Sequence, residues 1–488
     1  MYISNSSEML TLLNLPDDGT YGITKVEAID SIKYVHIERP PKPTYCPNCQ
    51  ARMHSKGIYV RTVNCPILQD TTRLILKVHE RGWQCTNKEC NHYMNETYPF
   101  LLPGSQSTDL TFFYVCEAMK DLNRTTASVA KQFNMSDTQV HDIFSAHVDL
   151  EALPLPEIIS VDEVYMNINN RRKYAFVIMD FVTGEIIDIV EDRWKDTLER
   201  YFLSKTIEER KNVKYIISDA YKPYLDFPKE YFPNSISIID SFHVVKYLIT
   251  QLNSYIHSVM KKYRERDMKE LEAKNHDTNR DCKTIKDSRE VHLLKNYRWV
   301  LLKNMDEINY SYKIYYNKGL QMNVDTFRIE EMFLNLDKNF RELRELKEKY
   351  IDFNSGTYAT NDEVENKLDE LIKEYRASSQ SIFVDFALLL KRYKKQIIAS
   401  FTTVQVQRKP KSEIIENYAR LSNGPMESFN RKPKDYKRNA RGSSNFHYTR
   451  NRILWATRRN PKYLSTPKTR KQIHSYSGKK RGSYNKNK

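Results

Sequence analysis

The amino-acid sequence predicts a multidomain α+β protein in which a β-rich domain is interrupted by a long, all-helical insertion. Paired cysteines mark a small domain near the N-terminus. Short apolar runs between residues 155 and 245 indicate a sheet, and a charged stretch with helical periodicity follows up to residue 411. A chain of 488 residues is long enough for two or three domains, so we expect these zones to fold separately.

The composition favours a polyanionic partner and excludes a membrane span. Lysine and arginine outnumber aspartate and glutamate by 78 to 62, which gives a formal net charge of +16. No signal peptide is visible, and no stretch approaches the roughly 18–20 apolar residues needed to cross a bilayer. Seven cysteines, an odd number, argue against a secreted disulfide framework, so we expect a reducing cytosol.

Two cysteine pairs predict a zinc ribbon. Cys46 and Cys49 form one tight pair, and Cys85 and Cys90 form the other. Each pair can donate two thiolates, and four thiolates in tetrahedral geometry suit a structural Zn²⁺ ion. A catalytic zinc is not expected, because four thiolates leave no open position for water.

The segment between the cysteine pairs is predicted to form the ribbon itself. The runs Val60–Val63 and Leu74–Val78 are β-rich and would bring the two pairs together. Cys65 lies between the pairs and is an alternative ligand. Cys116 and Cys282 are interpreted as small buried or neutral thiols.

Residues 125–147 predict two short helices separated by a tight turn. Thr125–Phe133 forms the first, and Ser136 is the expected N-cap of the second, with Gln139 completing a capping box. This pattern predicts a helix-turn-helix, whose second helix would enter the DNA major groove. A plain helical linker is the alternative, because the outward side chains are not very basic. Those side chains are Asp137, Thr138, Gln139, His141 and Asp142.

Two aspartates at the ends of apolar strands predict a metal-binding centre. Ile158–Val161 leads into Asp162, and Lys214–Ser218 leads into Asp219. Two more strands and a helix lie between them, so the order is strand, strand, strand, helix, strand. That order is typical of the ribonuclease-H-like fold, in which the first and fourth strands are neighbours. Close carboxylates raise each other's pKa unless a cation neutralises them, and Mg²⁺ is the natural cation.

A third acid is expected from Glu427. Asn423 is a candidate cap for a helix that would carry Glu427 on its first turn, with Asn430 and Lys434 on the same face. Pro433 lies inside this helix and predicts a bend, because it removes a hydrogen bond. Other acids compete with the chosen three, namely Glu163, Asp180, Glu413 and Glu416.

Apolar residues in the helical insertion recur at steps of three and four and predict one long helix. Packing within a helical hairpin of the same chain is the favoured explanation, and a dimer seam is the alternative. The stripe consists of Phe333, Leu336, Phe340, Leu343, Leu346 and Tyr350.

These signals divide the chain into six regions. The predicted regions are a zinc ribbon at 40–100, a helix-turn-helix at 105–150, the first part of the catalytic domain at 155–245, the helical insertion at 246–411, the C-terminal part of the catalytic domain with the glutamate helix at 412–458, and a basic disordered tail at 459–488.

Taken in order, these motifs resemble bacterial insertion-sequence transposases of the ISL3 family, a DDE group. The resemblance covers the chain from Cys46 to about Trp455, and the ordered combination is far more specific than any single motif. Besides the cysteine pairs and the helix pair, it rests on Ser160–Glu163, Ile217–Asp219, Asp240–Lys246, Asn423–Asn430 and Lys437–Asn445.

The resemblance implies that Asp162, Asp219 and Glu427 hold two Mg²⁺ or Mn²⁺ ions. Pro433 departs from the family pattern, in which an apolar residue often stands at this position. His243 and Lys246 match a family motif at a helix start, where they either contact DNA or only cap and pack the helix. Further DNA contacts, mostly to phosphates, are expected from Asn430, Lys434, Lys437, Arg438 and Arg441.

The sequence therefore predicts a transposase that binds the terminal inverted repeats of an insertion sequence and catalyses metal-dependent DNA cleavage and strand transfer. Its partners would be double-stranded DNA of the transposon ends and of the target, bound by a homodimer or a larger assembly. The expected location is the bacterial cytoplasm, at the nucleoid. The alternatives are a DNA-binding regulator or inactive copy with a non-catalytic scaffold, and a host nuclease for RNA–DNA hybrids.

Overall fold

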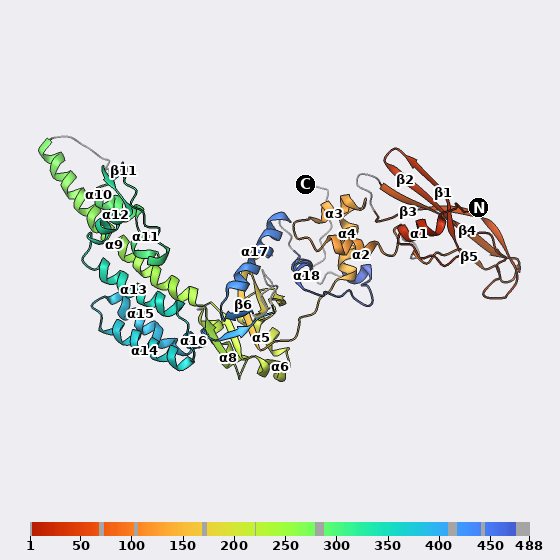
Figure 1. The fold of residues 1–488 in the computed structure, drawn as a ribbon. Helices are drawn as coiled ribbons and strands as arrows, with labels where there is room; N and C mark the ends of the chain where they lie inside the picture. The colour runs from red at the N-terminus through yellow and green to blue at the C-terminus, as the bar shows by residue number, and fades with distance from the viewer. Residues whose placement is uncertain are drawn as a thin grey trace, which may run out of the picture. The chain divides into compact units, whose positions relative to one another are not determined.

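The computed structural model describes residues 2–67, 73–101, 106–167, 173–219, 221–278, 287–407, 417–440 and 445–474. The chain forms two compact units, which are drawn in Figure 1. The first contains Met1–Ala152, Met166–Lys173 and Arg431–Lys488, and the second contains Leu153–Tyr165 and Tyr174–Asn430. No helix in the described part of the chain is long and apolar enough to cross a membrane.

The first unit begins with a sheet in the order β1-β2-β4-β3, and β5 pairs with β4. Antiparallel pairing of β3 with β4 contains both predicted runs, with Val63 opposite Leu76. Helix α1 (Ser6–Leu12) packs Leu10 into the same apolar core. The domain is therefore larger than the predicted range 40–100. Its strands are β1 (Gly22–Ile29), β2 (Ile32–Glu38), β3 (Met53–Asn64), β4 (Arg73–Cys85) and β5 (Tyr93–Asn95).

A bundle of short helices completes the first unit. It contains α2 (Thr111–Ala118), α3 (Thr126–Gln132), α4 (Asp137–His147), α18 (Phe446–Thr457) and α19 (Arg470–Ile473). The predicted capping box at the start of α4 is confirmed, because the Ser136 and Gln139 side chains both accept the expected backbone hydrogen bonds.

The C-terminal part of the chain differs from the predicted division. Helix α18 belongs to the first unit, where the Trp455 Nε1 atom donates to the backbone oxygen of Cys116 at 2.8 Å. Residues 459–474, which we predicted to begin a disordered tail, instead pack here: the Tyr463 ring lies 4.8 Å from the Trp455 ring. A backbone hydrogen bond from Leu464 to His147 adds to this contact.

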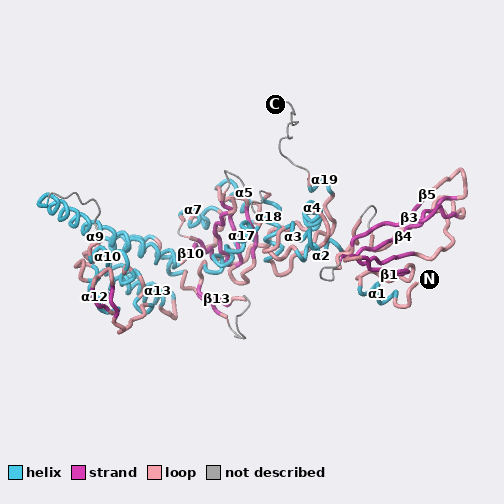
Figure 2. Tube along the Cα trace, turned by 90° about the horizontal axis from the view of Figure 1, so that it is seen from above, coloured by secondary structure: helices cyan, strands magenta, loops and turns pink. Residues whose placement is uncertain are grey.

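The second unit is built on a sheet in the order β10-β9-β6-β7-β8. Strand β6 is antiparallel to β7 and parallel to β9, which confirms that the first and fourth strands are neighbours. The strands are largely apolar on both faces and are buried accordingly. Figure 2 labels β10 of this sheet and helix α5. They are β6 (Ile158–Tyr165), β7 (Tyr174–Asp180), β8 (Ile186–Val190), β9 (Tyr215–Ser218) and β10 (Ile236–Ile239).

Helices cover one face of this sheet. Phe202 of α5 and Phe227 of α8 share an apolar cluster with Phe176 of β7. The connecting helices are α5 (Lys195–Leu203), α6 (Ile207–Asn212), α7 (Lys222–Leu225) and α8 (Phe227–Glu230). In a second apolar cluster, Ile217 and Ile238 of the sheet pack with Leu421, which precedes α17 (Gly424–Asn439).

The helical insertion begins with α9 (Ser241–Thr278), directly after β10. It has one large apolar core, but it is not all-helical, because it also contains the hairpins β11–β12 and β13–β14. Its remaining elements are α10 (Arg289–Asn296), α11 (Trp299–Leu302), the 3-10 helix Met305–Glu307, β11 (Tyr315–Asn317), β12 (Met322–Val324), α12 (Thr326–Leu334), α13 (Phe340–Ser355), α14 (Asn361–Ala377), α15 (Ser381–Arg392), α16 (Lys394–Ala399), β13 (Thr403–Gln405) and β14 (Tyr418–Arg420).

The predicted apolar stripe is divided between two helices. Phe333 lies on α12, whereas Phe340 and Tyr350 lie on α13, so the expectation of one long helix was wrong. The intervening Asn335–Asn339 is rich in asparagine and aspartate, which favour helix ends over helix interiors. All three aromatic rings are buried in the core of the insertion, which agrees with packing within one chain.

Candidate metal centres

Three aspartates lie in one row across the parallel strands of the second sheet. The first residues of β6 and of β10 are both paired with the first residue of β9. Each aspartate lies four residues after the first residue of its own strand. The shared register therefore brings Asp162, Asp219 and Asp240 to the same end of the sheet.

Asp162 is the member of this row on β6. Its pKa is raised to about 6, mainly by burial and further by the nearby carboxylates of Asp219, Glu163 and Glu427. Its Oδ1 atom accepts from the backbone N–H of Glu163 at 2.7 Å, and its Oδ2 atom accepts from Asn430 Nδ2 at 2.6 Å. These hydrogen bonds fix the orientation of the carboxylate.

Asp219 follows β9 and pairs with His243 on the first turn of α9. The His243 Nε2 and Asp219 Oδ1 atoms are 2.6 Å apart. This hydrogen bond raises the pKa of His243, and the charges of Asp219 and Asp240 act in the same direction. His243 therefore stands inside the carboxylate cluster and carries positive charge more readily than a free histidine.

Glu427 approaches the row from the first turn of α17. Its carboxylate, that of Asp240 and the His243 ring each offer a ligand atom, and these atoms all lie within 4.8 Å of one another. Burial, and then the charge of Asp219, raise the pKa of Asp240. The structure thus brings the three predicted acids together and adds a fourth, Asp240.

Asp240 is a candidate ligand that we did not predict from the sequence. It follows the apolar run Ile236–Ile239 in the same way that Asp219 follows its own strand. The apolar run before Asp240 is visible in the sequence. Its alignment with Asp162 is not, because it depends on the register of the strands.

Two buried amides lie on α17 and just before it. Asn430 has an Oδ1 atom that is buried and without a hydrogen-bond partner among the described residues. Asn423 is fully buried, and both polar atoms of its side chain also lack partners there, so the predicted side-chain cap does not form. Helix α17 starts instead with the backbone bond from Glu427 N–H to Asn423 O at 3.0 Å and continues through Pro433.

The competing acids have other contacts. Glu163 points to the opposite side of β6 from Asp162, where the Tyr224 hydroxyl and Arg193 bind its carboxylate. Asp180 holds the turn after β7 by accepting from the Val182 N–H at 2.8 Å. Glu413 and Glu416 lie outside the described residues.

The carboxylate cluster fits a hard divalent cation. Several acids of like charge converge, and burial together with the nearby carboxylates raises the pKa of Asp162, so a bound cation would stabilise the cluster. The unpartnered Asn430 oxygen is an additional acceptor beside Asp162. Mg²⁺ and Mn²⁺ prefer carboxylate and carbonyl oxygens of this kind.

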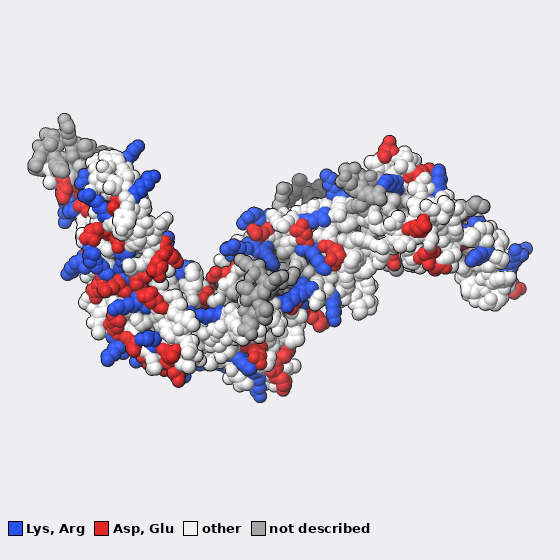
Figure 3. Space-filling view, viewed as in Figure 1, with Lys and Arg blue, Asp and Glu red and all other residues white. Residues whose placement is uncertain are grey.

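The predicted DNA-contacting residues lie mostly on exposed helix surfaces. Lys246 is exposed on α9, with its Nζ atom 5.7 Å from the Phe242 ring centre. Lys434 and Arg438 are exposed on α17, and burial lowers the pKa of the half-buried Lys437. Arg441 lies outside the described residues. Figure 3 shows lysine and arginine side chains gathered where α17 is drawn in Figure 1.

The four predicted cysteines form the other candidate centre. All four sulfur atoms lie within 4.8 Å of one another, with Cys46 and Cys90 3.6 Å apart and Cys49 and Cys85 3.4 Å apart. Four sulfurs at about 2.3 Å from one zinc ion would be roughly 3.8 Å apart, so these positions fit tetrahedral coordination. Although burial acts against it, backbone N–H groups lower the pKa of Cys46 to about 7, which favours the thiolate.

The remaining cysteines take no part in this cluster. Cys65 lies in the apolar core of the N-terminal sheet, where burial raises its pKa to about 11, so it does not replace one of the four ligands. Cys116 is buried on α2, as expected for a small structural thiol. Cys282 lies outside the described residues.

Comparison with known proteins identifies the family. A family model of the DDE ISL3 type, described as a transposase, matches residues 159–453, which is more than half of the chain. The match begins at β6 and ends within α18, so it includes all four acids of the cluster. No curated protein matches the sequence. With the resemblance predicted from the motifs thus confirmed, the chain belongs to the ISL3 family of DDE transposases.

Proposed function

We propose that this transposase binds the terminal inverted repeats of its insertion sequence and catalyses divalent-metal-dependent cleavage and strand transfer there. The observation that carries the proposal is the convergence of Asp162, Asp219, Asp240 and Glu427 in one cluster. Family membership supports DNA as the substrate. The cluster supports metal-assisted chemistry on phosphodiesters.

The topology of the second unit supports a ribonuclease-H-like assignment. Strands β6, β7 and β8 are consecutive and antiparallel, whereas β9 and β10 extend the sheet in parallel. Acids lie on β6 and directly after β9. Glu427 would enter from a helix that follows the insertion. This combination accounts for a catalytic centre built from residues distant in the sequence.

The acids would divide the metal ligands between them. Asp162 and Asp219 would bind two Mg²⁺ or Mn²⁺ ions, Glu427 would complete the shell of one ion, and Asp240 is a further candidate ligand. Such ions, when bound, activate an attacking oxygen and stabilise a leaving one. Asn430 holds the Asp162 carboxylate in position through its 2.6 Å hydrogen bond.

The reaction needs no covalent bond between protein and DNA. Water would attack a phosphodiester at the transposon end, and cleavage of the P–O3′ bond would release a 3′-hydroxyl. That hydroxyl would then attack a phosphodiester of the target, so that one bond is exchanged for another. Lys246 and His243, which lie on the first two turns of α9 beside the cluster, would contact the DNA at this centre.

The first unit would bind the repeat. We assign a structural Zn²⁺ ion to the four cysteines and DNA recognition to the helix-turn-helix formed by α3 and α4. Exposed basic residues of α17 would contact phosphates and contribute salt dependence rather than sequence choice. Assembly on two transposon ends would require a homodimer or a larger oligomer.

The test is nicking of a labelled duplex that carries the element's own terminal repeat, in Mg²⁺ and in Mn²⁺. We expect the wild type to nick at the repeat end and Asp219→Ala to be inactive. Asp196→Ala is the matched control, because Asp196 is exposed on α5 and should leave nicking unchanged. Specific binding without cleavage by the wild type would indicate a DNA-binding regulator or an inactive copy instead.

A further inference from the structure

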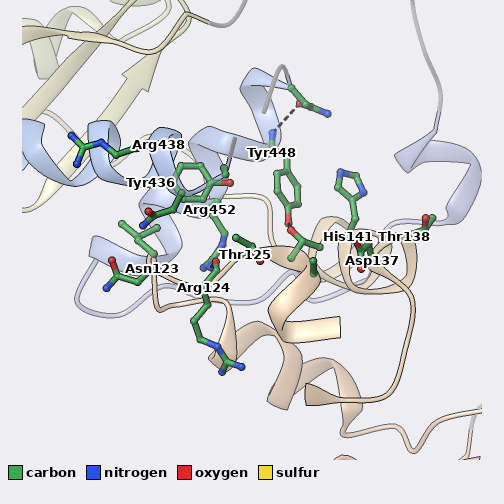
Figure 4. Close-up of a pocket in the computed structure, with 16 residues that line it drawn as sticks. Asn123, Arg124, Thr125, Asp137, Thr138, His141, Tyr436, Arg438, Tyr448 and Arg452 are labelled. Atoms are coloured by element: carbon green, nitrogen blue, oxygen red, sulfur yellow. Dashed lines mark hydrogen bonds between the residues drawn. The ribbon is translucent and has the colours of Figure 1, made fainter. Parts of the chain in front are cut away.

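A large groove in the first unit lies between the helix-turn-helix and the C-terminal helices. It has a volume of about 1210 Å³ and is lined by α3, α4, the end of α17 and α18. Figure 4 shows Arg438 of α17 on one side and Arg124, before α3, on the other, with Arg452 between them. The groove is therefore bordered by cationic side chains from separate parts of the chain.

The first turns of two helices open into this groove. Asp137 and Thr138 are the first two residues of α4, and Asn445 is the N-cap of α18. Helix N-termini carry partial positive charge and backbone N–H groups that suit anions. Asp137 is the one carboxylate among the described residues that line the groove, against three arginines.

Arg452 is a buried cation in the floor of the groove. It is 1% exposed, and its Nη2 atom donates to the backbone oxygens of Asp121 and Arg124 at 2.8 and 3.2 Å. Its Nη1 atom has no hydrogen-bond partner, and no ion pair to a carboxylate is formed, among the residues that the structure describes. Burying an uncompensated charge is unfavourable, and a polyanion in the groove would compensate it.

Two outward side chains further along α4 are only partly exposed, whereas Asp137, Thr138 and Gln139 at its start are exposed. The His141 ring stacks on the Tyr448 ring of α18 at 4.4 Å, and Asp142 pairs with His474 at 3.0 Å. Two of the side chains that we predicted to face DNA bases thus contact other protein groups. Of the side chains that stay exposed, Asp137 and Thr138 line the polar groove.

We propose that the groove between α3–α4 and α17–α18 binds consecutive phosphates of a DNA strand, independently of base sequence. The proposal rests on the proposed function, because DNA is the polyanion involved. This face of the helix-turn-helix would therefore bind the DNA backbone. Recognition of the repeat sequence would then come from residues outside the groove.

The test compares the binding of two duplexes, the terminal repeat and a scrambled duplex of equal length and composition. Affinities are measured over a range of salt concentrations without divalent metal. The variant is Arg124→Gln with Arg438→Gln, and the control is Lys462→Gln, an exposed lysine of the same unit outside the groove. Thermal unfolding of each variant checks that the bundle is intact.

We expect the double variant to lose affinity for both duplexes by the same factor, about 10-fold or more at low salt. The slope of log affinity against log salt should fall by about 2, one for each lost phosphate contact. The control should match the wild type. An unchanged slope and affinity, or a loss confined to the terminal repeat, would overturn the groove assignment.

The same experiment separates failure of the groove from failure of the function. If the wild type nicks the repeat end while the double variant binds like the wild type, only the groove assignment is wrong. If the wild type binds neither duplex, the proposed function fails and the groove assignment fails with it.

Discussion

The cysteine cluster and the carboxylate cluster are both groups of side chains that could hold a metal ion, but the chain assembles them in different ways. The four cysteines come from two tight turns of a single small sheet, and their four sulfur atoms surround one small space. The carboxylates come from three parallel strands and a helix that begins after the whole insertion. Four thiolates that surround an ion suit a structural role, whereas a row of carboxylates at the ends of parallel strands leaves room for a substrate.

The largest expected effect is at the carboxylate cluster. Asp162→Asn should abolish nicking, by about 10³-fold or more, since it removes a charge that would hold the proposed metal ions. Binding of the terminal repeat, measured by gel shift, should be unchanged. The matched control Asp196→Asn should retain full nicking. If Asp162→Asn lost binding as well, the two clusters would not have separate roles.

A substitution in the cysteine cluster should weaken DNA binding, which the Asp162 variant leaves unchanged. Cys46→Ser should release about one zinc ion per chain, measured by a colorimetric chelator, and weaken repeat binding by about 10-fold or more, because the turns lose their ligand. Cys65→Ala is the control, because Cys65 lies in the sheet core and should leave the zinc content at the wild-type value. Loss of zinc from the Cys65 variant would contradict the four-cysteine assignment.

A smaller effect is expected at Asn430. Asn430→Ala removes the 2.6 Å hydrogen bond to Asp162, and loss of such a supporting contact typically costs 10–100-fold in metal affinity or activity. A titration of nicking against Mg²⁺ should show a higher half-saturating concentration. An unchanged titration curve would show that the amide does not position the carboxylate.

The smallest effect is a pH dependence of stability without metal. The pKa of Asp162 is about 6 in the folded protein against 3.8 ordinarily, so its contribution to stability is present below pH 4 and is lost as pH rises through 6. Between pH 4 and 6.5 the free energy of unfolding of the wild type should fall by about 1–2 kcal/mol relative to Asp162→Asn. Urea unfolding in a chelator measures this difference, and parallel pH profiles would contradict it.

The two clusters also differ in how far they could be predicted from the sequence. The cysteine pairs are visible because each pair is local, and their turns need no knowledge of the fold. Asp162 and Asp219 could be selected because each follows an apolar run, although β6 continues past Asp162 to Tyr165. Asp240 follows such a run too, but its place in the row depends on the register of β10 against β9, which is a long-range property.

Partner choice was harder to predict than element type. The residues of α18 lie in the region 412–458 that was predicted for the catalytic domain, yet Ile453, Leu454 and Trp455 are buried in the first unit. Apolar side chains at helical spacing indicate that a face is buried and do not specify what covers it. The apolar stripe was misread as one helix for a related reason, since the break at Asn335–Asn339 keeps nearly the same spacing.

The insertion leaves the carboxylate cluster directly after Asp240 and returns to it just before Glu427. Arg420, near the returning end, donates to the backbone oxygens of Ser400 and Asn354, and its guanidinium lies 3.5 Å from the Phe401 ring centre. A chain with an unfolded insertion would keep three aspartates in the sheet but would not hold Glu427 beside them. Under the proposed function, DNA cleavage would therefore require a folded insertion, because Glu427 follows the insertion in the chain.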